Sequence, residues 1–366
     1  MLLGRCGFHN VLKMVTLCDV SMHGYVIQQW VAHCFDGMGD VFLGRCNDST
    51  RVAVKRIPHD ALDVTFDSTR AHSSEENTRT LVHSKSPDRG QLLREDIGFM
   101  KLLRHSHIVD LQACFVFGPS IYLVLGACSY GSISDVISSS YQCGLPEKAI
   151  ASILRQLLSA LTYLHSQLII HRSVRASHLL LDSAGTIRLT GFRLARKLTI
   201  DERYTTDFDS HLETSLLWLA PEVLGQDLNG YSTKADIYSV GATLCEIANG
   251  FPPFGDMERL EMLYEKSRGT TPRLLDSSTL PSYEEPSEHR NRTFTGSFHN
   301  ITGLCLRANP VNRPDANSLF SHSFLKKARR SLLGLLPLAQ TLDQMERVSG
   351  REEITAEKKD VPEWVF

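Results

Sequence analysis

Residues 171–193 read HRSVRASHLLLDSAGTIRLTGFR, and this stretch decides how the rest of the chain is interpreted. The middle of this stretch predicts a pair of strands. Polar and basic residues precede the pair at 171–178, and a Gly-Phe-Arg turn follows it. The sequence therefore predicts a short hairpin between two loops that carry the informative polar residues.

Composition limits the classes of protein to consider. Of the 366 residues, 42% are hydrophobic and 22% are charged, as expected for a globular protein with a sizeable core. The net charge of −2 argues against nucleic acid or an anionic membrane as a partner. No stretch approaches the ~20 apolar residues of a membrane span. The nine cysteines are odd in number and lack C-x-x-C spacing, which favours reduced thiols over a disulfide framework or a zinc site.

The first third of the chain has the alternating pattern of β-strands. Valine and aromatic residues alternate with polar ones, and Asn47-Asp48-Ser49 is a typical turn. A helix is expected over 92–104, and the polar stretch 58–90 is expected to be a mobile loop. The predicted strands lie at 25–32, 40–46, 51–57, 109–117 and 121–126.

Beyond Pro146 the apolar residues follow the period of a helix. Leucines and isoleucines from Ile150 to Leu164 fall on one helical stripe, and further helices are expected over 234–248 and between 257 and 328. The Ser-, Thr- and Pro-rich stretch 268–296 is expected to be a disordered loop. A β-rich beginning and a helical remainder predict an α+β fold with two lobes and a cleft between them.

The order of the short motifs resembles that of a protein kinase, which implies the bilobal kinase fold with a β-rich N-lobe and a helical C-lobe. Such an enzyme needs a strand lysine on the phosphates, a helix acid that holds the lysine, a catalytic Asp, and an Asn and an Asp for magnesium. Lys55 in Val-Ala-Val-Lys matches the first role, and Asp96, nine residues before His105, matches the second. Glu95 competes with Asp96, and a solvated surface charge is the ordinary alternative for each. The expected units are an N-terminal extension at 1–23, an N-lobe at 24–128, a C-lobe at 129–330 and a tail at 331–366.

The residues that would perform the chemistry are replaced. Ser173 stands where the catalytic Asp belongs, and a serine hydroxyl cannot act as that base. His178 and Gly191 stand at the two magnesium positions, although magnesium prefers oxygen ligands and glycine offers none. Phe192 keeps the apolar position, and Arg193 adds a positive charge that either partly replaces magnesium or faces solvent or an activation-segment acid. We therefore expect no catalytic residue and no bound metal.

The glycine-rich loop that covers the phosphates in kinases is incomplete. Counting back from Val41 puts Cys34 and Asp36 at the first two glycine positions and Gly39 at the third, and the other registers also fail. Asp36 would repel a triphosphate. We favour an ordinary hairpin turn for this stretch.

The C-terminal landmarks of the kinase pattern are intact. WLAPE at 218–222 matches the end of the activation segment, and DIYSVG at 236–241 matches the following helix motif. Glu222 is expected to form a buried ion pair with Arg313, and breaking such a pair from one side costs roughly 3–5 kcal/mol. These residues are structural rather than chemical.

Several phrases resemble a narrower group, the STRAD family of pseudokinase adaptors. They lie at 130–132, 171–178, 191–193, 230–241 and 364–366. The resemblance implies an inactive adaptor that binds liver kinase B, a Ser/Thr kinase, and activates it allosterically with an armadillo/HEAT-like scaffold of the calcium-binding-protein-39 family. Trp364 and Phe366 would anchor the tail on that scaffold, and Val365 departs from the family's Trp-Glu-Phe. A tail folded back on its own domain is the alternative.

The resemblance also implies that ATP is bound without magnesium, although a filled apolar core would show the same apolar lining. The activation segment, 191–222, would contact the partner kinase, with Arg172 and Arg193 as partner-binding residues and Arg172 available for an acidic group. The residues predicted to bind the nucleotide are Val31, Val41, Ala53, Lys55, Asp96, Leu125, Ala127, Cys128 and Leu180.

Two rival functions stay open on the sequence alone: an active Ser/Thr kinase with unorthodox catalysis, and a kinase-fold scaffold for other clients. The missing base and metal ligands argue against the first, because positioning and charge neutralisation are nearly all of this catalysis. We expect a cytoplasmic protein. The basic run 326–330 is either a nuclear-import signal or a solvated helix end.

Overall fold

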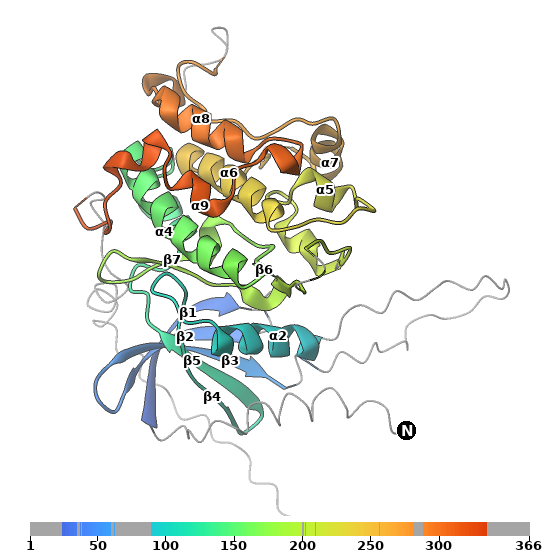
Figure 1. Cartoon of the computed structure of the whole chain (residues 1–366). Coiled ribbons are helices and arrows are strands. Elements are labelled where there is room, and N and C mark those ends of the chain that lie inside the picture. Colours follow the sequence, from blue (N-terminus) through green and yellow to red (C-terminus); the bar gives the residue numbers. More distant parts are fainter. Residues whose placement is uncertain are drawn as a thin grey trace, which may run out of the picture.

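Five antiparallel strands form the sheet of the N-lobe in the computed structural model, in the order β1-β2-β3-β5-β4 (Figure 1). The central strand β3 pairs with β2 and β5, which places Lys55 opposite Val41 on one side and Leu123 on the other. Because side chains alternate along a strand, Val54 is buried in a cluster on one face while Lys55 points to the other face. The strands are β1 (Tyr25–Cys34), β2 (Gly39–Cys46), β3 (Arg51–Pro58), β4 (Leu111–Phe117) and β5 (Ser120–Gly126).

The structure describes most of the two lobes. The described residues are 24–34, 37, 39–59, 62, 89–199, 201, 203–208, 210–255, 257–280 and 288–334.

One long helix, α2 (Arg89–Leu102), lies between the sheet and the C-lobe (Figure 1). Its apolar residues Leu93, Ile97 and Met100 are fully buried, and Asp96 lies on the same buried side. The helix begins three residues before the predicted range 92–104. The sequence did not indicate this earlier start, because the first turn has few apolar residues and shows no helical periodicity. The helix ends two residues earlier, where the N–H of Arg104 turns to the hydroxyl of Tyr163.

The C-lobe is built around α6 (Lys234–Asn249), whose residues are all buried except the first. Helix α4 (Glu147–Ser166) packs beside it and begins after Pro146, as the sequence predicts. The remaining helices are α3 (Ile133–Ser140), α5 (Pro221–Leu224), α7 (Arg259–Ser267), α8 (Gly296–Cys305) and α9 (Ala316–Leu319). Four short strands lie at β6 (Ile169–Ile170), β7 (Leu179–Leu181), β8 (Ile187–Leu189) and β9 (Arg196–Lys197).

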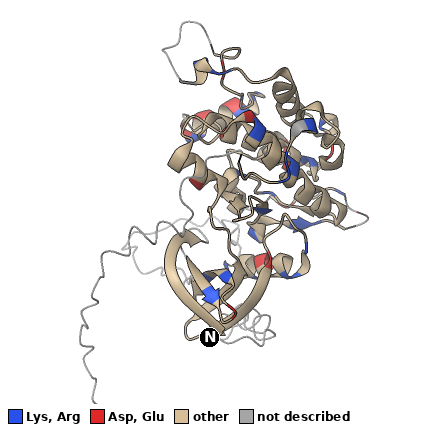
Figure 2. Cartoon of the chain, turned by 90° about the vertical axis from the view of Figure 1, so that its left-hand side faces the viewer, with Lys and Arg blue, Asp and Glu red and all other residues tan. Residues whose placement is uncertain are grey.

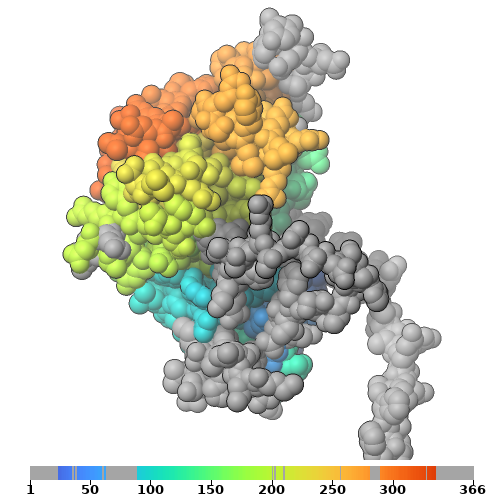
Figure 3. Space-filling model, turned by 90° about the vertical axis from the view of Figure 1, so that its right-hand side faces the viewer, coloured from blue at the N-terminus to red at the C-terminus, as the bar shows by residue number. Residues whose placement is uncertain are grey.

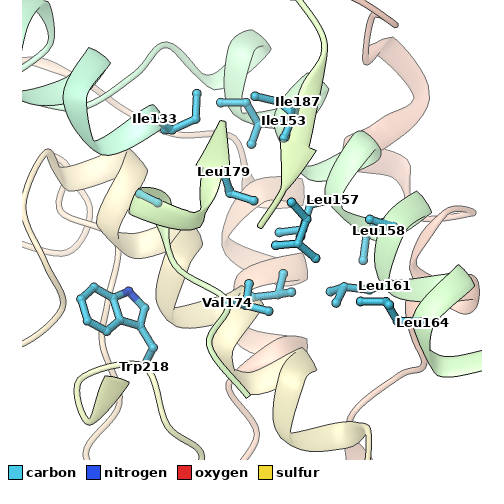
Figure 4. Close-up of a cluster of buried hydrophobic side chains, with 14 of the residues drawn as sticks. Ile133, Ile153, Leu157, Leu158, Leu161, Leu164, Val174, Leu179, Ile187 and Trp218 are labelled. Atoms are coloured by element: carbon cyan, nitrogen blue, oxygen red, sulfur yellow. The ribbon is translucent and has the colours of Figure 1, made fainter. Parts of the chain in front are cut away.

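The apolar stripe of α4 supports the 171–193 stretch from behind. Figure 4 shows Leu157 and Leu161 of α4 close to Val174, which lies in the first loop of that stretch, and to Leu179, which follows it. All four side chains are at most 2% exposed. The strand pair predicted within 171–193 forms as the antiparallel strands β7 and β8. The two loops are therefore held on a rigid core.

The prediction of a disordered loop at 268–296 is wrong for 268–280 and 288–296. Asp276 is fully buried, and its carboxylate accepts hydrogen bonds from the N–H of Phe294 (2.9 Å) and from the ring of His299 (2.8 Å). These partners lie about 20 residues further along the chain, so the polar composition of the segment could not predict that it is ordered. Residues 281–287 lie outside the described part, as do nearly all of 58–90 and the whole of 1–23.

The described residues also bear on metals, thiols and membranes. Their seven cysteines are all free thiols, and they contain no cluster of three or more His, Cys, Asp or Glu side chains suited to a metal ion. No described helix combines the length and the apolar character that crossing a membrane requires.

Candidate functional site

The cleft between the lobes contains a cavity of about 470 Å³, which is within the usual size range of small-molecule sites. Of the nine residues predicted to bind nucleotide, all but Ala127 line it. Ala127 lies against a separate small cavity beside β2 instead. The residues that do line the cavity are Val31, Val41, Ala53, Lys55, Asp96, Leu125, Cys128 and Leu180.

The polar end of the cavity carries more positive than negative charge. Lys55, Arg175 and Arg193 line it, together with Asp96 and Asp135. Asp135 is engaged at the start of α3, where its carboxylate accepts the N–H and the O–H of Ser132 at 2.8 and 2.7 Å. Over the molecule as a whole, both signs of charge are spread across the two lobes (Figure 2). The excess of cations is therefore a local property of the cavity, and it suits an anionic ligand.

Asp96 is the buried acid of this group. Burial raises the pKa of its carboxyl, while Lys55, Arg193 and a hydrogen bond from the N–H of Phe192 act in the opposite direction. Its Oδ1 atom has no hydrogen-bond partner among the described residues, although the side chain is only 3% exposed. The sequence correctly brings Lys55 and Asp96 to one site, where a further donor would satisfy the carboxylate.

Ser173 is unavailable for proton transfer. It is 2% exposed, and its hydroxyl lies 2.8 Å from the hydroxyl of Ser215, which is also buried. An ordinary serine hydroxyl does not accept a proton near neutral pH. The geometry thus adds a second obstacle, because this group is enclosed and does not face the cavity.

His178 and Gly191 fit together as a pair. The Nδ1 atom of His178 lies 2.7 Å from the carbonyl oxygen of Ser173, and its Nε2 atom lies 3.2 Å from Arg175. With a carbonyl at Nδ1 and an arginine at Nε2, the ring is neutral, donates from Nδ1 and accepts at Nε2. Burial and then Arg175 hold the pKa of His178 well below its usual value. Neither nitrogen is left for a metal ion.

The imidazole also occupies the space that a side chain at 191 would need. Gly191 has a left-handed backbone (φ 88°), and a Cβ atom built there would lie 2.7 Å from Nδ1 of His178. Real Cβ atoms do not approach a ring so closely. An aspartate at 191 and the observed ring of His178 therefore exclude each other. The residues present do not fit a magnesium site.

Arg193, which was predicted to bind a partner, lines the cavity instead of facing outward, and its role with a partner stays a prediction. It is 9% exposed, it lines the cavity, and it lies 3.4 Å from the hydroxyl of Thr214. Its charge acts on Asp96 and on Cys34. The sequence left open whether Arg193 faces solvent, pairs with an activation-segment acid or places a positive charge near the phosphate site. Its location in the cavity favours the third alternative.

Arg172, the other residue predicted to bind a partner, is also turned into its own chain. Its side chain is buried, and its guanidinium donates to Leu194, Asp207 and Tyr231. An acidic group does meet this arginine, but it is Asp207 of its own activation segment. Arg172 is therefore closed to a partner in this conformation.

The groups that give a kinase its shape are in place. The carboxylate of Asp236 accepts the N–H groups of His171 and Arg172, both at 2.9 Å. The ring of His171 packs edge-on against Phe192 with centroids 5.0 Å apart. The predicted pair of Glu222 and Arg313 is confirmed as a buried, two-pronged contact at 2.6 and 2.8 Å.

A buried acid behind the cavity escaped the sequence analysis. Glu246 of α6 accepts the N–H of Ala176 at 3.0 Å and the indole N–H of Trp218 at 2.8 Å, both on the same oxygen. Burial raises the pKa of Glu246 to about 7. It ties the first loop of the 171–193 stretch to the end of the activation segment. An acidic residue inside an otherwise apolar helix was the sequence feature that could have indicated a buried carboxylate.

Arg175 is a second residue that sequence reasoning did not assign. It lines the cavity, bonds to His178 and donates to the carbonyl oxygen of Thr214 at 2.8 Å. The sequence feature that could have indicated this role is the position of Arg175, two residues after Ser173 in the loop 171–178. It is the third cation of the site, beside Lys55 and Arg193.

The segment that corresponds to the glycine-rich loop joins β1 and β2, which pair as an antiparallel hairpin. A Cβ atom at Gly39 would lie 2.8 Å from the carbonyl oxygen of Arg56, so contact with β3 requires this glycine. Gly37 has φ 83° and lines the cavity together with Cys34. Asp36, which was predicted to repel a triphosphate, lies outside the described residues.

Comparison with known proteins agrees with this geometry. The model of the protein kinase domain matches residues 37–325, so the chain belongs to the protein kinase domain family. Within that family it belongs with the STE20-related kinase adapter proteins.

The similarity to these adapters extends over much of the chain. It is 38% identical to the adapter protein strd-1 of Caenorhabditis elegans, over 67% of this chain and 65% of that protein. It is 35% identical to adapter protein alpha of Bos taurus, over 75% and 85%. It is 30% identical to adapter protein beta of Homo sapiens, over 88% and 81%. The match spans slightly less than two thirds of the length of the nematode relative.

Proposed function

We propose that this chain is a catalytically inactive kinase-fold adaptor that binds a partner Ser/Thr kinase and activates it allosterically. The partner is a kinase of the liver kinase B type, and a scaffold of the calcium-binding-protein-39 type completes the complex. The names of the relatives support the adaptor role, since each is described as a STE20-related kinase adapter protein.

One observation supports the proposal most strongly: the groups for proton transfer and metal binding are replaced, while the contacts that hold the kinase fold are retained. Ser173 is enclosed, and His178 fills the space beside Gly191, so neither a base nor a metal site remains. The contacts of Asp236 and the ion pair of Glu222 still hold the loops in order. Such a molecule offers a folded surface to another kinase and no route for phosphoryl transfer.

The activation segment supplies much of that surface. On the face of the C-lobe in Figure 3, this segment (yellow-green) adjoins the region of α7 (gold). Lys266 of α7 donates to the carbonyl oxygens of Leu216 and Leu217 at 2.9 and 3.0 Å. Arg259 of α7 lies 2.6 Å from Glu213 of the same segment. These contacts favour a preformed docking surface, which lowers the entropic cost of binding.

We also propose that the cavity binds ATP without magnesium. Apolar residues of both lobes suit an adenine ring, and Lys55, Arg175 and Arg193 supply positive charge for the phosphates. A thermal unfolding measurement with ATP, in the presence of magnesium or a chelator, tests this. An equal rise of the melting temperature in both conditions is expected. A rise that requires magnesium contradicts the proposal.

The tail is proposed to anchor the scaffold through Trp364 and Phe366, which lie outside the described residues. Removing an interface aromatic typically costs 2 kcal/mol or more, or about 30-fold in affinity. We expect Trp364→Ala to weaken capture of the scaffold by that amount, with Val365→Ala as the matched control. Equal binding by both variants refutes the anchor.

The adaptor role itself is tested with purified components. The partner kinase is assayed on a peptide substrate alone, with this chain, and with this chain and the scaffold. A rise in partner activity on adding this chain is expected, while the chain alone incorporates no phosphate. Phosphate incorporation by the chain alone that disappears in Lys55→Met overturns the proposal in favour of an active kinase.

A further inference from the structure

Two arginines converge on one carboxylate of the activation segment. Arg172 lies two residues after β6, and Arg196 lies in β9, which pairs with β6. The Nη1 atom of Arg172 lies 3.2 Å from Oδ2 of Asp207, and the Nε atom of Arg196 lies 3.6 Å from the same oxygen. Asp207 is thus the shared anion of a two-arginine site.

The backbone at Asp207 is held as firmly as its side chain. Nη1 of Arg172 also donates to the carbonyl oxygen of Asp207 at 3.1 Å and to the hydroxyl of Tyr231 at 2.9 Å. The Tyr231 hydroxyl in turn donates to that same carbonyl oxygen at 2.5 Å. Two backbone hydrogen bonds of 2.9 Å join Thr205 to Tyr231. The site therefore ties the activation segment to the loop before α6.

The accessibility of the two arginines differs. The side chain of Arg172 is 3% exposed, whereas that of Arg196 is 50% exposed and that of Asp207 is 34% exposed. An open hollow beside Asp207 is lined by Arg196 and Arg203. A small anion from solution can reach this site if the carboxylate is removed.

A pair of arginines is the typical receptor for a phosphate group that orders an activation segment after phosphorylation. In this chain the pair already holds a carboxylate from the segment itself. We propose that Arg172 and Arg196 form an anion-binding site which Asp207 occupies permanently, so that the activation segment is ordered without phosphorylation. All members of this site belong to one chain, so its occupancy does not depend on the identity of a partner.

Hydrogen exchange of the full chain tests the proposal at the amides of Thr205 and Tyr231, whose hydrogen bonds report on the segment. Loss of charge-assisted hydrogen bonds is expected to speed their exchange about 10- to 100-fold in Asp207→Ala. Asp227→Ala is the matched control, because Asp227 is an exposed acid of a nearby turn whose carboxylate accepts hydrogen bonds only from Asn229 among the described residues. Exchange unchanged in Asp207→Ala overturns the proposal.

Rescue by sulfate separates an anion site from a purely structural contact. In Asp207→Ala, sodium sulfate at the ionic strength of a sodium chloride control is expected to restore slow exchange. Adding Arg196→Gln, a change at a half-exposed position, is expected to abolish that rescue. If sulfate has no effect beyond that of chloride, Asp207 acts only as a local cap and the anion site is refuted.

Discussion

The fit between His178 and Gly191 leads to a quantitative prediction about a single methyl group. The substitution Gly191→Ala adds a Cβ atom at 2.7–2.9 Å from three ring atoms of His178, on a backbone with φ 88°. The left-handed backbone costs an alanine about 1–2 kcal/mol. Overpacking against a buried ring adds about 1–3 kcal/mol. We therefore expect Gly191→Ala to lower the free energy of unfolding by about 2–5 kcal/mol.

A second glycine measures the backbone cost alone. Gly269 has φ 92°, and a Cβ atom built there meets nothing within 4 Å. Gly269→Ala should therefore cost only the ~1–2 kcal/mol of the left-handed backbone. The difference between Gly191→Ala and Gly269→Ala is the steric contribution of the His178 ring.

A double-mutant cycle assigns that contribution to the ring directly. In the background of His178→Ala the ring is gone, so Gly191→Ala should cost no more than Gly269→Ala. The coupling energy between positions 178 and 191 is then about 1–3 kcal/mol, measured by urea unfolding of the four proteins. A coupling near zero, with equal costs at 191 and 269, refutes the argument that this ring excludes a side chain at 191.

Three further outcomes follow from the same structure. Burial holds the pKa of Glu246 at about 7, above its usual 4.5, so the folded state binds this proton more tightly and stability falls as pH rises from 4.5 through 7. Glu246→Gln keeps an oxygen that can accept both hydrogen bonds but cannot ionise. The melting temperature of this variant minus that of the wild type should therefore increase as the pH rises from 4.5 to 7. A difference that does not change with pH contradicts the role of Glu246 ionisation. Glu222→Ala strands Arg313 as an unpaired buried charge and should cost about 3–5 kcal/mol in urea unfolding, whereas a loss below 1 kcal/mol would show the pair to be dispensable. Arg193→Ala removes one of three cations from the cavity and should weaken metal-free ATP binding about 10-fold by calorimetry, and unchanged affinity would place the phosphates elsewhere.

The sequence predicted the framework of this molecule because the framework depends on local patterns. Alternation gave the strands, and the helical stripe from Ile150 to Leu164 gave α4. The spacing that assigned Lys55 and Asp96 to one site is correct because the strand and helix that carry them are rigid elements. Losses at single positions, such as Ser173, were visible because each motif surrounds them with intact neighbours.

The directions of the long basic side chains could not be predicted from the same patterns. Arg172 and Arg193 were expected to face a partner, and both are buried inside the chain. Their directions depend on the path of residues 203–208 and on the left-handed turn at Gly191, which are set by contacts distant in sequence. The order of 268–280 escaped prediction for the same reason, since it rests on the burial of Asp276 against partners near residue 294 and beyond.

The replaced residues of this site take part in new contacts. A histidine at 178 is compatible only with a glycine at 191, and together they close the metal position with a neutral, fully bonded ring. The retained Arg172 holds the activation segment through Asp207. Under the proposed function, restoring an aspartate at 191 alone is not expected to restore a metal site, because its Cβ atom would meet the ring of His178. Recovery of a metal site requires at least His178→Asn together with Gly191→Asp, and recovery of a base requires Ser173→Asp to be accommodated beside Ser215.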